Sequence, residues 1–122
     1  MILIFGGAYN GKLEYVREKL NIKNDEIFFC NGKNLDYSKK AICGLHKFTL
    51  DSENPLEVLK ENISKLQNKI IICDEISSGI VPLEKSDRIW REETGRCLQY
   101  LSKNSSKVVR IFCGLEMVLK DV

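Results

Sequence analysis

The feature that most constrains the fold is the junction between residues 2–5 and residues 6–12. Residues 2–5 form an apolar run, Ile-Leu-Ile-Phe, that is typical of a buried strand, and Gly-Gly-Ala-Tyr-Asn-Gly-Lys follows directly. The spacing Gly-x-x-x-x-Gly-Lys between a strand and a helix predicts a phosphate-binding P-loop. Its glycines let successive backbone N–H groups converge on one anion, and the next helix directs its positive N-terminal end at the same point.

We therefore expect this segment to bind the phosphates of a nucleotide. The expected nucleotide-binding residues are Gly6, Gly7, Ala8, Tyr9, Asn10, Gly11, Lys12 and Leu13. Lys12 supplies the charge for the outer phosphates, but Leu13 stands where a Ser or Thr usually gives its hydroxyl to Mg²⁺. A metal ion would need a carboxylate from elsewhere in the chain, or the loop binds anions without turning them over. The alternative is a glycine turn with a chance lysine.

Length and charge limit the classes of protein that fit the chain. Its 122 residues predict a single domain over residues 1–122, and its net charge of +2 comes from interspersed acids and bases. Such a distribution lacks the basic stripe of a nucleic-acid-binding protein. No apolar run is long enough to span a membrane, and the N-terminal run lacks the charged leader of a signal peptide. We expect a cytoplasmic protein whose partner is a small anion rather than nucleic acid or a membrane.

The cysteine pattern favours reduced thiols. The five cysteines are Cys30, Cys43, Cys73, Cys97 and Cys113, an odd number without a C-x-x-C pair. We expect them to serve as small apolar side chains. Cys30, Cys73 and Cys113 each end a predicted strand, so a metal or redox site at one sheet edge is the alternative.

Hydrophobic patterns predict the remaining elements. We expect strands at residues 2–5, 27–30, 70–73, 108–113 and 116–120, and helices at 12–20, 36–50, 55–66 and from Ser86 onward. Strands that alternate with helices predict an α/β fold. The expected architecture is a P-loop nucleotide-binding fold, with a mostly parallel sheet flanked by helices and a C-terminal hairpin.

Asp74 and Glu75 are candidate metal-binding residues, and Glu75 is also a candidate catalytic residue. They directly follow the central strand at residues 70–73, and ligands bind at the carboxyl ends of such strands in open α/β sheets. A carboxylate there can hold Mg²⁺ or take a proton from a substrate hydroxyl. The alternative is a solvated strand end. The loop at residues 77–82, which must bend at Gly79, is a further candidate for ligand binding.

Two other residues stand out from their surroundings. His46 is the only histidine, and a neutral imidazole can attack a phosphoryl centre or move a proton, so it is a candidate catalytic residue. The alternative is a half-buried helix residue. Gly95 lies in the middle of the last expected helix, which indicates close approach by another backbone or by a ligand.

Residues 74–82 and the helix after them resemble the signature of the adenosylcobinamide kinase/adenosylcobinamide-phosphate guanylyltransferase family of cobalamin biosynthesis. The matching residues are 74–82, Arg88, 90–92, Gly95, Arg96 and Gln99, together with Gly6, Gly7, Ala8, Gly11 and Lys12 in the loop. The matching segments, one near each end of the chain, together cover about half of its length.

The resemblance implies a P-loop α/β fold that forms homo-oligomers, uses ATP or GTP, and depends on Mg²⁺. Members phosphorylate adenosylcobinamide and then transfer GMP to that phosphate through a histidine-bound intermediate. Carried over, Gly6, Gly11 and Lys12 hold the triphosphate and Glu75 serves the metal or the substrate. The same carry-over assigns substrate binding to Arg88, Arg91 and Arg96, and His46 lies in the region of the guanylylated residue.

Departures from the family pattern leave three hypotheses open. Leu13 follows the loop lysine, Leu98 replaces an asparagine of the signature helix, and the chain is shorter in its middle. The first hypothesis is a compact kinase/guanylyltransferase. The second is a degenerate, non-catalytic homologue that binds a nucleotide or a corrinoid as a regulatory or oligomer partner. The third is an unrelated P-loop kinase that acts on another small substrate.

Overall fold

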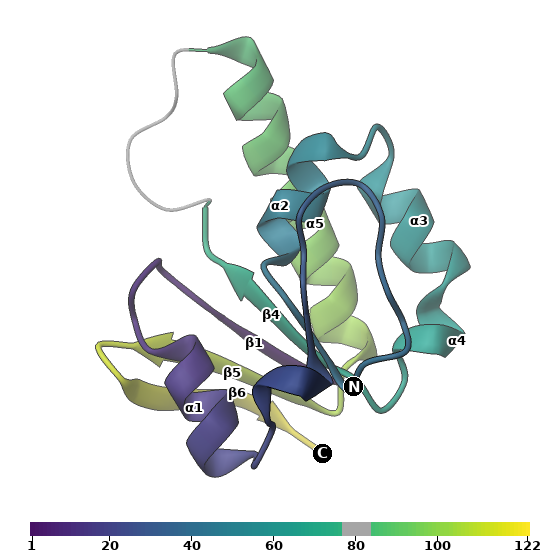
Figure 1. The fold of residues 1–122 in the computed structure, drawn as a ribbon. Coiled ribbons are helices and arrows are strands. Elements are labelled where there is room, and N and C mark those ends of the chain that lie inside the picture. The colour runs from purple at the N-terminus through teal and green to yellow at the C-terminus, as the bar shows by residue number, and fades with distance from the viewer. Residues whose placement is uncertain (77–83) are drawn as a thin grey trace.

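The computed structural model describes residues 1–76 and 84–122, which build a six-stranded sheet with helices on both faces (Figure 1). The strands are β1 (Ile2–Gly6), β2 (Ile27–Phe29), β3 (Ala41–Cys43), β4 (Ile70–Asp74), β5 (Lys107–Phe112) and β6 (Leu115–Asp121). Their order across the sheet is β2-β3-β4-β1-β5-β6. All pairs are parallel except β5 with β6, which form an antiparallel hairpin. The predicted α/β fold with a mostly parallel sheet and a C-terminal hairpin is confirmed.

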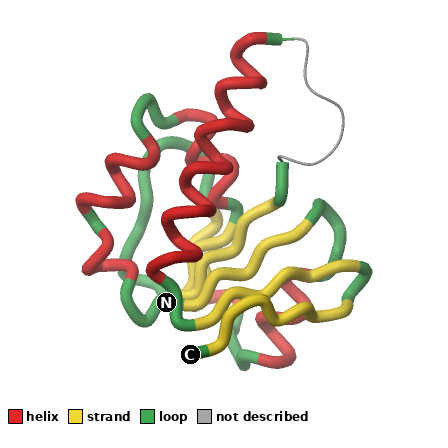
Figure 2. Tube along the Cα trace, turned by 180° about the vertical axis from the view of Figure 1, so that it is seen from behind, coloured by secondary structure: helices red, strands yellow, loops and turns green. Residues whose placement is uncertain are grey.

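The helices divide between the two faces of the sheet. They are α1 (Lys12–Lys19), α2 (Leu45–Asp51), α3 (Pro55–Glu61), α4 (Ile63–Leu66) and α5 (Lys85–Asn104), with a 3₁₀ turn at Asn24–Glu26. α1 packs on one face, and α2 to α5 pack on the other (Figure 2). None of the helices in residues 1–76 and 84–122 is long and apolar enough to cross a membrane.

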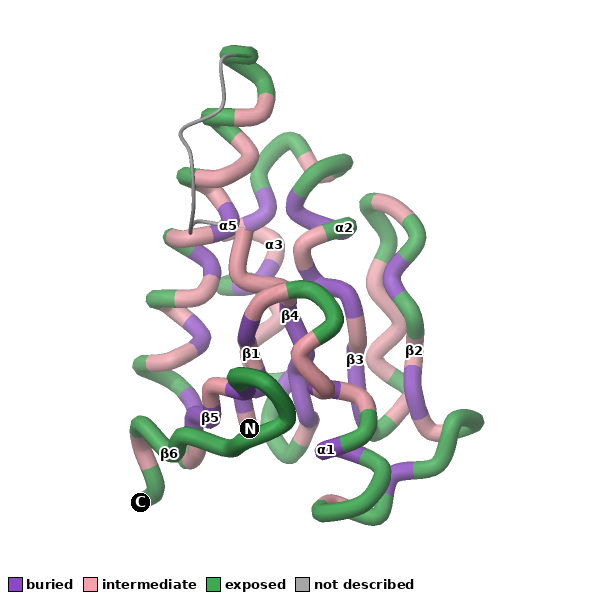
Figure 3. The backbone as a smooth tube through the Cα atoms, turned by 90° about the vertical axis from the view of Figure 1, so that its left-hand side faces the viewer, coloured by how far each residue is buried: buried purple, intermediate pink, exposed green. Residues whose placement is uncertain are grey.

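The central strands are buried on both faces, as expected for parallel strands between two helical layers. Leu3 and Ile71 pack toward α2 to α5, whereas Ile4 and Ile72 pack toward α1. Figure 3 shows this burial in the central strands and the contrasting exposure of β6. Because side chains alternate along a strand, the residues at the ends of β1 and β4 are also divided between the two faces.

The helix predicted at residues 36–50 is wrong in its first half. That region contains β3, which pairs with β4, and α2 begins only at Leu45. Gly44 joins the two elements with φ of 82°, a left-handed conformation that glycine adopts without steric cost. Its N–H donates to the carbonyl oxygen of Ile72 at 2.9 Å. The apolar residues that suggested a single helix therefore belong to two elements, the strand β3 and the helix α2.

Two helix starts differ in detail from the prediction. α3 begins at Pro55, where a helix was predicted to start, and its N-cap residue Asn54 makes no capping hydrogen bond with its side chain. α5 begins at Lys85, so Ser86 lies inside its first turn and is not its cap. The loop predicted at residues 77–82 lies outside the described residues.

Three of the five free cysteines are buried and Cys43 is partly buried, as predicted for small apolar side chains. Burial raises the pKa of the Cys30 and Cys97 thiols to about 12 and that of Cys43 to about 11, and it also raises the pKa of Cys73. These thiols stay protonated at neutral pH. Cys113 differs from the prediction because it is exposed in the turn between β5 and β6.

Two glycines have opposite surroundings. A Cβ at Gly6 would overlap the carbonyl oxygen of Ile111 in β5, so close packing of β1 against β5 requires glycine there. At Gly95, by contrast, no atom of another described segment lies within 4 Å of the position that a Cβ would take. Of the two expectations for Gly95, close approach by a backbone is therefore not met among the described residues, and close approach by a ligand stays a prediction.

This difference predicts opposite effects of the same substitution. Gly6→Ala should lower the free energy of unfolding by about 1–3 kcal/mol, because the added methyl group overpacks against the β5 backbone. Gly95→Ala should raise it by about 0.5–1 kcal/mol, because alanine favours a helix interior and the site is open. Urea unfolding of the two variants and the parent protein measures both effects. Equal destabilisation by the two substitutions would contradict the packing described at these glycines.

Candidate functional site

The glycine loop, residues 6–12, connects β1 to α1 at the C-terminal edge of the parallel strands. Tyr9 and Gly11 have left-handed φ values of 60° and 92°, which turn the chain sharply. Among the described residues, the backbone N–H groups of residues 7–12 donate to no acceptor. The Tyr9 side chain is fully exposed and does not fill the loop. Unpaired N–H groups on a tight turn before a helix are suited to binding an anion.

The turn between β5 and β6 supports the glycine loop through Asn10. The carbonyl oxygen of Asn10 accepts a hydrogen bond from the Gly114 N–H at 2.9 Å, and its side-chain Oδ1 accepts one from the Cys113 N–H at 3.4 Å. Gly11 packs against Gly114, whose Cα lies 3.4 Å from the position that a Gly11 Cβ would take. Asn10 therefore directs its side-chain oxygen to the hairpin.

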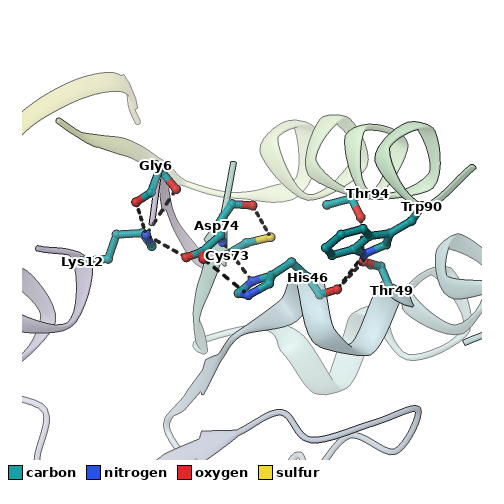
Figure 4. A network of polar contacts seen from close by, with 9 residues as sticks. Gly6, Lys12, His46, Thr49, Cys73, Asp74, Trp90 and Thr94 are labelled. Atoms are coloured by element: carbon teal, nitrogen blue, oxygen red, sulfur yellow. Dashed lines mark hydrogen bonds and ion pairs between the residues drawn. The ribbon is translucent and has the colours of Figure 1, made fainter. Parts of the chain in front are cut away.

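Lys12 lies beneath the loop with only 7% of its side chain exposed. Its Nζ donates to the carbonyl oxygens of Gly6 at 3.2 Å and Gly7 at 2.7 Å, and it forms an ion pair with Asp74 Oδ1 at 2.8 Å (Figure 4). Because an ammonium group has three N–H donors, these three partners satisfy it. A phosphate in the loop must take the place of one of them to contact Lys12.

The two carboxylates after the central strand point to opposite faces of the sheet. Asp74 faces Lys12, whereas Glu75 forms an ion pair with Arg110 Nε at 3.1 Å on the α5 side. Strand geometry explains this separation, because successive side chains alternate. The residue opposite Lys12 is therefore Asp74, and Glu75 belongs to a different part of the surface.

His46 lies in the first turn of α2 and faces Asp74 from the side opposite Lys12 (Figure 4). Its Nδ1 accepts a hydrogen bond from the Asp74 backbone N–H at 3.2 Å, and its Nε2 lies 3.4 Å from Asp74 Oδ2. Because Nδ1 uses its lone pair as the acceptor, a neutral ring carries its proton on Nε2. Burial lowers the pKa of His46, partly offset by the negative charge of Asp74, and favours this neutral ring.

Helix α5 fixes the position of His46 through its backbone. Trp90 Nε1 donates to the His46 carbonyl oxygen at 2.8 Å and lies 3.1 Å from Thr49 Oγ1. The Thr49 hydroxyl in turn lies 2.6 Å from the Thr94 hydroxyl in a buried hydrogen bond. The sequence did not single out Thr49 or Thr94 as polar partners, because their contact depends on how α2 packs against α5.

A cavity of about 240 Å³ opens beside these residues. Its described lining residues are Tyr9, Asn10, Gly11, Lys12, Leu13, Glu14, Cys43, Gly44, His46, Ile72 and Asp74. Sequence reasoning did not single out Cys43 and Gly44 as site residues, because it missed β3. A strand prediction at that position would have placed both of them at a strand end, where ligands collect.

The arginines of α5 are absent from the described lining of this cavity. Arg88 is exposed, Arg91 is half-buried, and Arg96 forms an ion pair with Glu93 at 2.9 Å. The structure thus brings Lys12, Asp74 and His46 together. It places Glu75 and the three arginines elsewhere.

The donor set at the cavity does not form a ready site for Mg²⁺. No group of three His, Cys, Asp or Glu side chains in the described residues is arranged to hold a metal ion. The two carboxylate oxygens of Asp74 face Lys12 and His46, and Leu13 offers no oxygen ligand. We therefore assign no step of the chemistry to a resident metal.

Comparison with known proteins identifies a family for most of the chain. The model of the family described as cobinamide kinase / cobinamide phosphate guanyltransferase matches residues 33–119. A search of curated proteins found no match. The matched region contains His46, Asp74, Glu75 and the whole of α5, whereas the glycine loop precedes it.

The environment of His46 predicts its tautomer and the direction of its pKa shift. Since the chain has one histidine, its ring signals need no residue assignment. We expect a long-range ¹H–¹⁵N correlation spectrum to show the proton on Nε2. The pKa should lie below the ordinary value of 6.5, because burial disfavours the charged ring. A proton on Nδ1, or a pKa above 6.5, would contradict the described geometry.

The lowered pKa of His46 also makes the free energy of unfolding depend on pH. Because the pKa is lower in the folded protein, the unfolded chain binds more protons as the pH falls below about 6.5. The contribution of His46 to stability is therefore fully present above that pH and is lost as the pH falls through the folded-state pKa. His46→Gln should remove this part of the pH dependence, which urea unfolding at about pH 5 and about pH 7.5 measures.

Proposed function

The chain belongs to the cobinamide kinase / cobinamide phosphate guanyltransferase family, and we propose that it binds ATP or GTP at the glycine loop and transfers a phosphoryl group to cobinamide. The observation that carries this proposal is the convergence of Lys12, Asp74 and His46 on the cavity beside the loop. The description of the family names both a kinase and a guanyltransferase activity. The geometry at Lys12, Asp74 and His46 favours the kinase activity.

Nucleotide binding follows from the groups that the loop presents. The N–H groups of residues 7–12 would donate to the non-bridging oxygens of the phosphates, with the N-terminus of α1 behind them. Lys12 would exchange the carbonyl oxygen of Gly7 for a phosphate oxygen while Asp74 keeps its ammonium in place. This exchange is favourable because a hydrogen bond to a charged oxygen is stronger than one to a carbonyl.

Transfer to the acceptor needs a base at the end of β4. In the proposed step, the cobinamide hydroxyl oxygen bonds to the terminal phosphorus and the nucleoside diphosphate leaves with the bridging oxygen. The hydroxyl proton would pass to the carboxylate of Asp74, which lines the cavity beside Lys12, whereas Glu75 lies on the other side of the strand end. Lys12 would offset the negative charge that the leaving group gains.

Loss of the loop lysine tests nucleotide binding. We expect Lys12→Ala to bind ATP and GTP about tenfold more weakly or worse than the parent protein in isothermal titration calorimetry, because it removes a charged donor. Lys19→Ala is the matched control, since Lys19 is exposed at the far end of the same helix and should leave affinity unchanged. Absence of nucleotide binding by the parent protein, or equal affinity of the two variants, would refute the proposal.

A second candidate function is nucleotide binding without transfer, which would suit a regulatory or oligomer partner. Leu13 favours it, because this residue offers no ligand to a metal ion. The state of His46 argues only against guanylyl transfer, because the ring is held in a form that is not nucleophilic. To carry GMP, an imidazole nitrogen must attack the α-phosphorus of GTP with a free lone pair while pyrophosphate leaves. Here Nδ1 accepts the Asp74 N–H, and Nε2 bears the proton, so neither nitrogen is ready.

Mass spectrometry separates these functions. After incubation with adenosylcobinamide, ATP or GTP, and Mg²⁺, we expect phosphorylated cobinamide and no GMP adduct on His46. His46→Asn should still form the product, because its side-chain oxygen can accept the Asp74 N–H in place of Nδ1. A GMP adduct on His46 would overturn the argument from its tautomer. Nucleotide binding with no product would favour the non-catalytic function.

A further inference from the structure

A buried pair of threonine hydroxyls joins α2 to α5 beside Trp90. Thr49 and Thr94 are only 3% and 1% exposed, and their hydroxyl oxygens lie 2.6 Å apart. Burying a hydroxyl group is costly unless it is hydrogen-bonded, and valine would fill the same space without that cost. Packing alone therefore does not explain why hydroxyl groups occupy these two positions.

The directions of these hydrogen bonds follow from the number of protons that each group carries. The Thr49 hydroxyl donates to the His46 carbonyl oxygen at 3.0 Å (Figure 4). Because a hydroxyl group has one proton, Thr49 must accept the hydrogen bond that it shares with Thr94. The Trp90 indole N–H donates to the same carbonyl oxygen at 2.8 Å. Two donors, one from α2 and one from α5, therefore converge on the His46 carbonyl oxygen.

The orientation of α2 depends on such contacts, because the helix is short. It has seven residues, and isolated helices of fewer than about 12 residues are marginal in water. It also follows Gly44, which places few steric limits on the joint between β3 and α2. Leu45 and Phe48 pack into the core, but apolar contacts are not directional. The hydrogen bonds to the His46 carbonyl oxygen are directional and therefore fix how α2 is turned.

The His46 ring would move with any rotation of α2. Its Nδ1 lies 3.2 Å from the Asp74 backbone nitrogen, and its Nε2 lies 3.4 Å from Asp74 Oδ2. These distances are at or beyond the upper end of the usual range for hydrogen bonds, so a small rotation would break both contacts. Lys12 would then hold only the other carboxylate oxygen of Asp74, and the carboxylate could turn about that contact.

We propose that Trp90 is a positioning residue, which acts through the His46 carbonyl oxygen to hold the imidazole ring against Asp74. The ring in turn keeps the Asp74 carboxylate directed at the cavity beside the glycine loop. The catalytic consequence rests on the proposed function, in which Asp74 accepts the proton of the substrate hydroxyl. Trp90 is absent from the described lining of that cavity, so its effect on the reaction is indirect.

The single histidine reports on this arrangement without any assay of activity. A long-range ¹H–¹⁵N spectrum at about pH 8, where the ring is neutral, should show only the Nε2–H form in the parent protein. We expect Trp90→Phe, which removes the N–H and keeps an aromatic ring, to bring the ¹⁵N shifts of the two ring nitrogens closer together. The physical reason is that a released ring exchanges between its two tautomers.

The rate of transfer should respond to the same substitution. We expect Trp90→Phe to lower kcat for phosphorylation of cobinamide about tenfold and to change the KM for the nucleotide less than about twofold, because a misdirected base slows the chemical step only. Leu101→Val is the matched control. Leu101 is fully buried on the same helix, so its truncation destabilises the protein without removing a group of the network. It should keep the parent spectrum and the parent kcat.

Thr49→Val and Thr49→Ser form a second pair of variants, should Trp90→Phe fail to fold. The valine removes a donor to the His46 carbonyl oxygen and the serine keeps it, so only the valine should alter the spectrum and kcat. An unchanged histidine spectrum, a changed spectrum with the parent kcat, or an equal change in Leu101→Val overturns the inference. If the spectrum responds as expected but the parent protein transfers no phosphoryl group, the positioning of His46 by Trp90 stands and the proposed transfer fails.

Discussion

The ion pair between Lys12 and Asp74 joins the glycine loop to the end of the neighbouring strand. Gly6 at the end of β1 pairs in register with Asp74 at the end of β4, so the ion pair closes the corner where the two strands leave the sheet. A buried ammonium group is costly without a partner, and the loss of one member of such a pair typically costs about 3–5 kcal/mol. The path of the loop therefore depends on the register of the two central strands.

A continuous polar network extends from this ion pair to the far side of the sheet (Figure 4). Asp74 contacts His46 through its N–H and its carboxylate, and the His46 carbonyl oxygen accepts the Trp90 N–H. The Thr49–Thr94 hydrogen bond then ties α2 to α5 a second time. The network links α1, β4, α2 and α5 around the edge where ligands bind in such sheets. The position of Asp74 is thus tied to that of α5 through His46.

The sequence predicts the fold well where a pattern has one physical cause. The apolar run before the glycine loop and the Pro55 helix start each express a local rule, and both elements form as predicted. β3 was missed because it has only three residues and their spacing continued into α2. Asp74 and Glu75 were treated as one acidic group, although the two-residue period of a strand separates them. The partners of Lys12 and the tautomer of His46 depend on tertiary packing, which local patterns do not encode.

Lys12 uses its N–H donors on groups of the protein itself, and this has a consequence for the selectivity of the glycine loop. Its ammonium group already has three acceptors, two of which are neutral carbonyl oxygens. A neutral ligand could only replace one carbonyl with another, so it would gain little from Lys12. A phosphate oxygen instead replaces a neutral acceptor with a charged one, and the unpaired N–H groups of the loop add to that gain. The loop should therefore discriminate by charge before any contact with the base, and selectivity for the acceptor must arise elsewhere in the molecule.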